Sequence, residues 1–260
     1  MEEWYGGEEL TERVQDLLDM SLYEEAEEML DQYGIHHDDP WEVHFLYSRI
    51  YSEQNHPKKA LDHLKECLKL DPDNPDSLLA LFYVYAQMGD MALGGKYLDR
   101  AIRKQPNHEL ILNARLWYTV ETSQFFETIS IYEKNHSKLE YNPEALRNAG
   151  MAYEHLGNYD KALLCYKTSL ELDPDNEETT DLLADHFLLR GNPEKCVDIY
   201  KSYLKRSPKN IKGMSRLVFC LSQCGQIEEA EEAAQKIIDI YPNSPVGYVD
   251  YSYLFLPACF

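Results

Sequence analysis

The chain repeats one residue pattern every 34 positions, and the repeat runs from residue 7 to residue 244 without an insertion. A period of this length is typical of proteins built from stacked supersecondary units, each too small to bury its own apolar face. The spacing therefore favours a chain that grows by adding units over one that encloses a single large core. The frames are 7–40, 41–74, 75–108, 109–142, 143–176, 177–210 and 211–244, followed by a half frame at 245–260.

Fixed places of the frame hold residues of similar size or chemistry. In the clearest copy, places 4, 7, 8, 11, 15, 20, 24, 27 and 32 are Leu146, Ala149, Gly150, Tyr153, Gly157, Ala162, Tyr166, Ser169 and Pro174. The twentieth place is small in all seven frames: Ala26, Ala60, Gly94, Thr128, Ala162, Cys196 and Ala230. The fifteenth is glycine in four, at Gly89, Gly157, Gly191 and Gly225, and the thirty-second is proline in five, at Pro72, Pro106, Pro174, Pro208 and Pro242.

Each frame contains two stretches with apolar residues at helical spacing. In the clearest copy these stretches are 146–153 and 162–170. Gly157 suits the left-handed end of the first helix, and Pro174 marks where the second cannot continue. Asn142, just ahead of a proline, suits the N-cap of the next first helix. The sequence therefore predicts an antiparallel helix pair in every frame.

This pattern resembles the tetratricopeptide repeat, and the resemblance covers nearly all of the chain after its first six residues. It implies an all-α fold, a right-handed superhelical tetratricopeptide solenoid of seven helix-turn-helix repeats plus a C-terminal half repeat, as a single domain over 1–260. It also implies a non-enzymatic scaffold that binds a peptide or helix of a partner protein in a concave groove lined by the first helices.

The groove-lining places of the family identify the candidate binding residues. An apolar ribbon is expected from the second to the fifth repeat, because large apolar side chains on a concave surface serve as anchors. Lateral packing of the same rings against neighbouring repeats is the alternative, and both stay open. The apolar candidates are Phe45, Leu79, Tyr83, Trp117 and Met151, and the polar candidates are Arg49, Arg147, Asn148, Lys212 and Arg216.

Three of the polar candidates raise a second possibility. Co-chaperones of this family grip an acidic chaperone tail in a carboxylate clamp, and Arg147, Lys212 and Arg216 match its basic positions in type. The two asparagine positions of the clamp hold a methionine and a leucine here. Asp181 and Asp185 stand in the intervening groove, where they would repel an acidic tail or neutralise the basic residues.

Charge and cysteine usage limit the kinds of partner and the cellular location that we expect. The formal net charge is -21, which disfavours nucleic acid as a partner. Residues 1–40 carry 14 acidic residues against Arg13 alone, consistent with a solvated capping repeat or with an acidic patch that attracts a basic partner. The six cysteines form no CxxC pair and indicate reduced thiols. With no signal-peptide features and no apolar run long enough to span a membrane, we expect a cytoplasmic protein.

Motifs for catalysis are absent from the sequence. It contains no phosphate-binding glycine loop, no HExxH and no G-x-S-x-G. The run 36–39, His-His-Asp-Asp, is metal-capable, but adjacent residues rarely share one ion. We expect no catalytic residue, no cofactor and no metal site.

Two departures from the repeat remain. The fourth frame, 109–142, is degenerate, with Arg115, Thr119, Thr128 and Glu140 at places where the pattern expects other residue types. Its helices are expected to pack less regularly, which changes the local pitch or bends a ligand site around Trp117. The apolar half frame 245–260 suggests a self-association surface of an assembly subunit, a segment that folds back, or a regulatory piece of a longer multidomain protein or enzyme.

Overall fold

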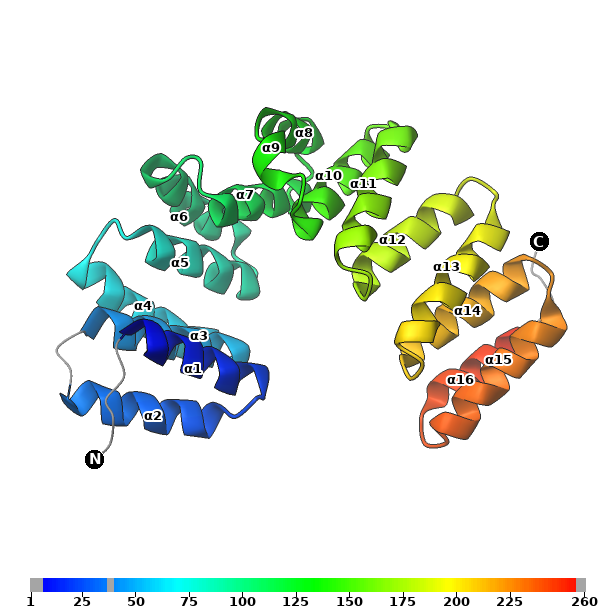
Figure 1. The fold of residues 1–260 in the computed structure, drawn as a ribbon, viewed down its shortest axis with the longest axis horizontal. Helices are drawn as coiled ribbons and strands as arrows, with labels where there is room; N and C mark the ends of the chain where they lie inside the picture. Colours follow the sequence, from blue (N-terminus) through cyan, green and yellow to red (C-terminus); the bar gives the residue numbers. More distant parts are fainter. Residues whose placement is uncertain (1–6, 37–39, 256–260) are drawn as a thin grey trace. The chain divides into compact units, whose positions relative to one another are not determined.

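The computed structural model describes residues 7–36 and 40–255, and every regular element within these ranges is an α-helix (Figure 1). The predicted all-α class is therefore confirmed. The helices are α1 (Gly7–Asp19), α2 (Tyr23–His36), α3 (Pro40–Glu53), α4 (Pro57–Leu70), α5 (Pro75–Gln87), α6 (Met91–Lys104), α7 (Glu109–Glu121), α8 (Phe125–Lys134), α9 (His136–Leu139), α10 (Pro143–His155), α11 (Tyr159–Leu172), α12 (Glu177–Leu188), α13 (Pro193–Arg206), α14 (Ile211–Gln223), α15 (Ile227–Ile240) and α16 (Pro245–Tyr253).

The helix starts follow the 34-residue period. From α5 onward, the first helices of the pairs begin at Pro75, Glu109, Pro143, Glu177, Ile211 and Pro245. The second helices begin at Tyr23, Pro57, Met91, Phe125, Tyr159, Pro193 and Ile227. Successive helices pack against each other, for example α3 with α4, α5 with α6, and α10 with α11 (Figure 1). The helix pairs predicted from the spacing are thus present.

Local interactions explain why each first helix begins and ends where it does. The side chain of Asn74 accepts hydrogen bonds from the backbone N–H groups of Asp76 and Ser77, at 3.1 and 3.0 Å. Asn142 caps α10 in the same way through Ala145, at 2.9 Å. At the other end, the fifteenth place has a left-handed backbone in every frame, at Ser21, Asn55, Gly89, Ser123, Gly157, Gly191 and Gly225. The position requires this geometry even where the residue is not glycine.

Replacing Ser123 by glycine is expected to stabilise the protein. Ser123 has φ of 59°, a conformation that costs a residue with a Cβ about 1 kcal/mol more than glycine. Part of that gain is lost because glycine has more freedom in the unfolded chain, so we expect the free energy of unfolding to rise by about 0.5 kcal/mol. Urea denaturation followed by circular dichroism measures the change. The matched variant Gly225→Ala should change it in the opposite direction, and a destabilised Ser123→Gly would contradict the assignment.

The chain forms two compact units, residues 1–118 and 119–260. In the first unit, a core of buried side chains joins α5, α6 and α7 through Phe82, Leu98 and Ile111. In the second, Tyr200 and Val218 belong to a core shared by α13, α14 and α15. Ala184 of α12 also belongs to this second core, so the two cores are built by three and by four successive helices. A pair therefore buries its apolar surface against its neighbours, as the repeat predicts.

Small residues allow the helices of a pair to approach closely. Gly94 lies so near α5 that a Cβ atom there would be 3.0 Å from the carbonyl oxygen of Phe82. At Gly150 a Cβ atom would be 2.5 Å from the ring of Tyr166, which is 1% exposed. The size restriction at these places therefore reflects direct helix contact.

The fourth repeat is irregular, as its sequence predicts. Its second helix, α8, ends at Lys134 after 10 residues, whereas α4, α6 and α11 each run for 14. The chain then turns at Asn135 into the short α9. Four other repeats pair an aromatic residue at the eleventh place with a small residue at the twentieth. Here Thr128 donates a hydrogen bond to Thr119 at 2.9 Å, and both are fully buried. The boundary between the two units falls in α7 of this repeat.

Candidate protein-binding surfaces

A pocket of about 610 Å³ opens in the first unit beside three first helices, α3, α5 and α7. Its position agrees with the expectation that first helices carry the binding surface. The lining combines an aromatic pair with polar groups. Its residues are Ser52, Glu53, Asn55, Tyr83, Ala86, Gln87 and Trp117.

The aromatic pair comes from ninth places of consecutive frames. The ring centroids of Tyr83 and Trp117 are 6.1 Å apart. Trp117 also meets Phe82 edge-on at 5.5 Å, so one side of the indole rests on the core. Tyr83 nevertheless keeps 45% of its surface exposed. Trp117 therefore packs laterally, as one of the two interpretations expects, whereas Tyr83 faces solvent, and the role of the pair as anchors stays a prediction.

Phe45 and Leu79 are half-buried. Phe45 stacks on Trp41 with ring centroids 5.0 Å apart. Leu79 packs against the core cluster that contains Phe82. These two side chains therefore contribute more to helix packing than to an open wall.

Polar bonds hold the edge of the pocket in place. The side chain of Gln87 donates to the carbonyl oxygen of Ser52 and to Oδ1 of Asn55, both at 3.1 Å, and so ties α5 to the end of α3. Arg49 donates to the side-chain oxygen of Gln15 on α1. Burial lowers the pKa of the Arg49 guanidinium. Arg49 thus links α1 to α3, and its predicted role in orienting a ligand stays a prediction.

The remaining candidates lie in the second unit. Met151 on α10 is half-buried. Arg147 is only 13% exposed and forms an ion pair with Glu178 of α12 at 3.2 Å. Asn148 is 2% exposed, so its side chain packs inside the unit and does not line an open surface. The sequence places Asn148 on the inward-facing side of its helix, but the fold covers it.

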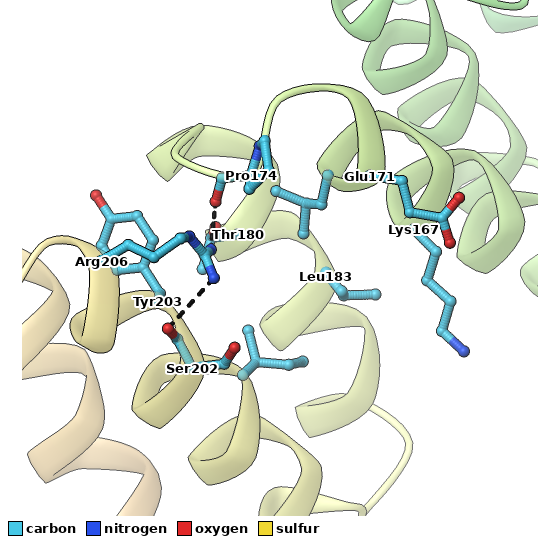
Figure 2. Close-up of a pocket in the computed structure, with 10 residues that line it drawn as sticks. Lys167, Glu171, Pro174, Thr180, Leu183, Ser202, Tyr203 and Arg206 are labelled. Carbon is cyan, nitrogen blue, oxygen red and sulfur yellow. Dashed lines mark hydrogen bonds between the residues drawn. The ribbon is translucent and has the colours of Figure 1, made fainter.

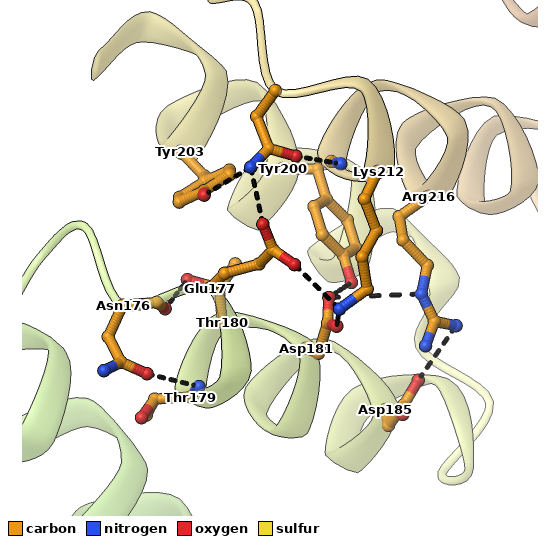
Figure 3. A network of polar contacts seen from close by, with 12 residues as sticks. Asn176, Glu177, Thr179, Thr180, Asp181, Asp185, Tyr200, Tyr203, Lys212 and Arg216 are labelled. Atoms are coloured by element: carbon orange, nitrogen blue, oxygen red, sulfur yellow. Dashed lines mark hydrogen bonds and ion pairs between the residues drawn. The ribbon is translucent and has the colours of Figure 1, made fainter. Parts of the chain in front are cut away.

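Lys212 and Arg216 face a row of carboxylates on α12 (Figure 3). Nζ of Lys212 lies 2.8 Å from Glu177 and 2.9 Å from Asp181. Arg216 is more loosely held, 4.0 Å from Asp181 and 4.0 Å from Asp185. The expectation that aspartates neutralise this basic pair is confirmed in geometry.

The same contacts shift the protonation equilibria. Hydrogen bonds from Lys212 and Asn210 lower the pKa of the Glu177 carboxyl. Hydrogen bonds with Glu177 and Asp181 raise the pKa of Lys212. Burial raises the pKa of Asp185, and the nearby Arg216 offsets only part of that rise. Lys212 is therefore paired with carboxylates of α12 and offers little net positive charge to an acidic tail. This pairing argues against a carboxylate clamp at this surface.

A second cavity, of about 300 Å³, lies between α11, α12 and α13 (Figure 2). Its floor is apolar, with Leu170, Leu183 and Ile199. Arg206 spans one edge, where it donates to the carbonyl oxygen of Pro174 and pairs with Asp175 at 2.9 Å. The arginine joins neighbouring repeats, so this cavity is explained by repeat packing.

The pocket between α14 and α16 was not identified from the sequence. It has a volume of about 330 Å³. One signal in the sequence could have indicated this pocket. Asp250 occupies the sixth place of the half frame, the same place as the groove candidate Arg216 in the preceding frame. The lining residues are Ser215, Arg216, Val218, Phe219, Ser222, Asp250, Tyr253 and Leu254.

The last helix leaves apolar side chains uncovered. On and after α16, Tyr248, Val249 and Phe255 are exposed. Residues 256–260 lie outside the described residues. Self-association through 245–260 stays a prediction.

Other sequence expectations concern metals, thiols and membranes. In the described ranges, no group of three or more His, Cys, Asp or Glu side chains is placed to hold a metal; residues 37–39 of the metal-capable run lie outside those ranges. The cysteines at 67, 165, 196, 220 and 224 are free thiols, and Cys259 lies outside the described residues. Within residues 7–36 and 40–255, no helix has both the length and the apolar character that a membrane span needs.

The helix pairs, their period and their surfaces define an all-α helical-repeat protein. Family models described as "tetratricopeptide repeat" match residues 143–176 and residues 51–116 and 187–248. The first of these matches coincides with the clearest frame, and together they cover more than half of the sequence. The chain belongs to the tetratricopeptide repeat family.

Known proteins of several kinds are similar in sequence to this chain. Protein bimA of Emericella nidulans is 21% identical over 166 residues, which are 59% of this chain and 21% of bimA. The peroxisomal targeting signal receptor of Kluyveromyces lactis is 20% identical over 204 residues, 76% of this chain and 36% of the receptor. The chain thus spans well under half of the length of these relatives.

Solved structures agree on the fold. PilW, a type IV pilus biogenesis factor, has a TM-score of 0.71 at 18% identity, covering 82% of this chain and 99% of PilW. A chain of the APC/C Cut9–Hcn1 hetero-tetramer has a TM-score of 0.72 at 11% identity, covering 93% of this chain and 48% of that one. At these identities the likeness shows a tetratricopeptide solenoid fold and no particular partner.

Proposed function

We propose that this chain is a non-enzymatic protein-binding module, and that the pocket at Tyr83 and Trp117 holds an apolar side chain from a peptide or helix of the partner. The observation that supports it best is the aromatic pair at consecutive ninth places, exposed Tyr83 and half-buried Trp117, which lines a pocket of about 610 Å³. Tetratricopeptide repeats are a general protein-interaction module, which supports the proposal.

The pocket leaves part of its aromatic lining exposed to water. Tyrosine and tryptophan bury large areas and lose few rotatable bonds on binding, so they dominate many interfaces. Trp117 is already fixed by Phe82 and Tyr83, which lowers the entropic cost of ordering it in a complex. Polar groups at the rim, such as Gln87 and Glu53, supply hydrogen bonds around an apolar centre.

The relatives fit this proposal in kind. One of them is named a peroxisomal targeting signal receptor, a name that describes a binding function of that protein. Because the chain spans only part of its relatives, a regulatory tetratricopeptide segment of a larger protein is compatible with the same pocket. A cytoplasmic location belongs to the proposal, since the five described cysteines are free thiols.

Tryptophan fluorescence tests where the ligand binds. In a Trp4→Phe/Trp41→Phe variant, Trp117 is the sole tryptophan of the three in the chain. Binding of a tryptophan-free peptide, selected from a phage-displayed random library, is expected to shift its emission to shorter wavelength and to reduce acrylamide quenching, because the partner covers the indole.

The matched reporter is a Trp4→Phe/Trp117→Phe variant, which retains Trp41. Phenylalanine at position 41 or 117 keeps an aromatic ring against Phe45 or Phe82. Trp41→Phe also removes the hydrogen bond from Nε1 to Ser77, so circular dichroism is used to check that the first variant is folded. A peptide that changes Trp41 emission and leaves Trp117 emission unaltered would contradict the proposed site.

A further inference from the structure

The pocket between α14 and α16 contains an incompletely satisfied carboxylate. Oδ2 of Asp250 is shielded from solvent and has no hydrogen-bond partner. Burial raises the pKa of the Asp250 carboxyl, and a hydrogen bond with Ser215 offsets part of the rise. Leaving such an acceptor unpaired typically costs about 1–3 kcal/mol. The position is therefore unfavourable unless another group completes it.

Two aromatic rings flank this carboxylate. Phe219 from α14 and Tyr253 from α16 line the same pocket as Asp250. They are 39% and 67% exposed, so their faces are open to an incoming group. An acidic group beside aromatic faces suits a cationic side chain, because the cation gains both an ion pair and contact with the rings.

The cation already present does not complete the site. Arg216 lines the pocket, but its guanidinium lies 4.0 Å from Asp181 and 4.0 Å from Asp185 on α12. Within the described residues, no ion pair joins Asp250 to any lysine, arginine or histidine. With Lys212 bound to Glu177 and Asp181, the acidic groups of this surface outnumber the basic ones.

We propose that this pocket binds an arginine or lysine side chain presented by a partner protein. The terminal torsion of an aspartate is broad, so a small rotation of the Asp250 carboxyl turns its unpaired oxygen towards such a group. Phe219 and Tyr253 then pack against the stem and the charged head of the ligand. The site lies entirely in the second unit, and it does not depend on the pocket at Tyr83 and Trp117.

Charge also argues for the identity of the occupant. Residues 254–260, which follow α16 in the sequence, include no basic residue, so they cannot supply the cation. The chain as a whole carries a formal net charge of -21, which attracts basic partners and repels acidic ones.

Two peptides that differ only in charge test the proposal on the intact chain. The probes are acetyl-Gly-Ala-Arg-Ala-Gly-amide and the same peptide with the neutral isostere citrulline, titrated into isotopically labelled protein and followed by amide chemical shifts. The arginine peptide is expected to shift signals from residues 215–222 and 247–254. It should bind at least about tenfold more tightly than the citrulline peptide, since only the arginine peptide forms a charge-assisted hydrogen bond with Asp250.

The variant Asp250→Asn keeps the shape of the side chain and removes its charge. It should abolish the preference for arginine. The matched control is Asp239→Asn, which removes the same charge from an exposed residue on α15 and should keep the preference. Equal affinity of the wild-type protein for both peptides, shifts confined to other helices, or an undiminished preference in Asp250→Asn would each overturn the proposal. The comparison of the two peptides on the wild-type protein tests the proposal even if Asp250→Asn folds poorly.

Discussion

Replacing Gly150 with alanine is expected to lower the free energy of unfolding by about 2 kcal/mol. The new Cβ atom would lie 2.5 Å from one ring carbon of Tyr166 and 2.7 Å from another. Tyr166 is 1% exposed and packed between α10 and its neighbours, so its ring has no open space to enter. The gain in helix propensity from glycine to alanine, about 1 kcal/mol, offsets only part of this overpacking.

Two comparisons separate the steric cost from other effects. Gly157→Ala, in the same repeat, introduces a Cβ whose nearest neighbour is 4.0 Å away but forces alanine to adopt φ of 76°, so it should cost about 1 kcal/mol. In a Tyr166→Leu background, Gly150→Ala should cost less than in the wild type, because the ring is gone. Guanidinium denaturation measures the free energy of unfolding of the wild type, the three single variants and the double variant. A Gly150→Ala protein as stable as the wild type would show that the helices of this pair can separate without loss.

Removing both rings of the aromatic pair is expected to weaken peptide binding about a hundredfold. Central aromatic anchors typically contribute about 2–4 kcal/mol when truncated, and about 2.7 kcal/mol corresponds to a factor of one hundred. Tyr83→Ala alone should cost less than the double change, since Trp117 remains in the pocket. Because Tyr83 is 45% exposed and Trp117 lies at the edge of its core cluster, the double variant should retain its helical content.

The repeat period predicted the helices well because it encodes local chemistry. Asn142 was expected as a cap, and it accepts a backbone hydrogen bond at the start of α10, as Asn74 does at the start of α5. The fifteenth place was expected to end the first helix, and its backbone is left-handed even at Asn55 and Ser123. Such features depend on a few neighbouring residues, which a single sequence displays directly.

The surfaces were harder to predict because exposure depends on the neighbouring repeat. The frame places of Asn148 and Tyr83 predicted that both side chains face the groove. The fold buries Asn148, however, and leaves Tyr83 exposed to solvent. The irregular fourth frame was recognised from its residue types. The sequence did not, however, show that the boundary between two compact units falls in its first helix.

The ion pairs of Lys212 were also predicted only in part. Asp181 was expected near Lys212, and the structure places them 2.9 Å apart. The contribution of Glu177, at 2.8 Å, was not anticipated, because it requires the actual reach of two flexible side chains across adjacent helices. The unpaired oxygen of Asp250 was missed for a related reason. The sequence pattern gives the place of the residue in the frame, but whether its oxygen finds a partner depends on packing.

The central claim is that the aromatic pair on α5 and α7 holds the partner. Isothermal titration calorimetry of one selected peptide with the wild type, with Tyr83→Ala/Trp117→Ala and with Tyr141→Ala tests it most directly. Tyr141 is an exposed tyrosine of the second unit that is not among the pocket's lining residues, and it serves as the matched control. The account predicts that the double variant loses about a hundredfold in affinity while Tyr141→Ala binds like the wild type. Equal affinity of a folded double variant and the wild type would contradict it.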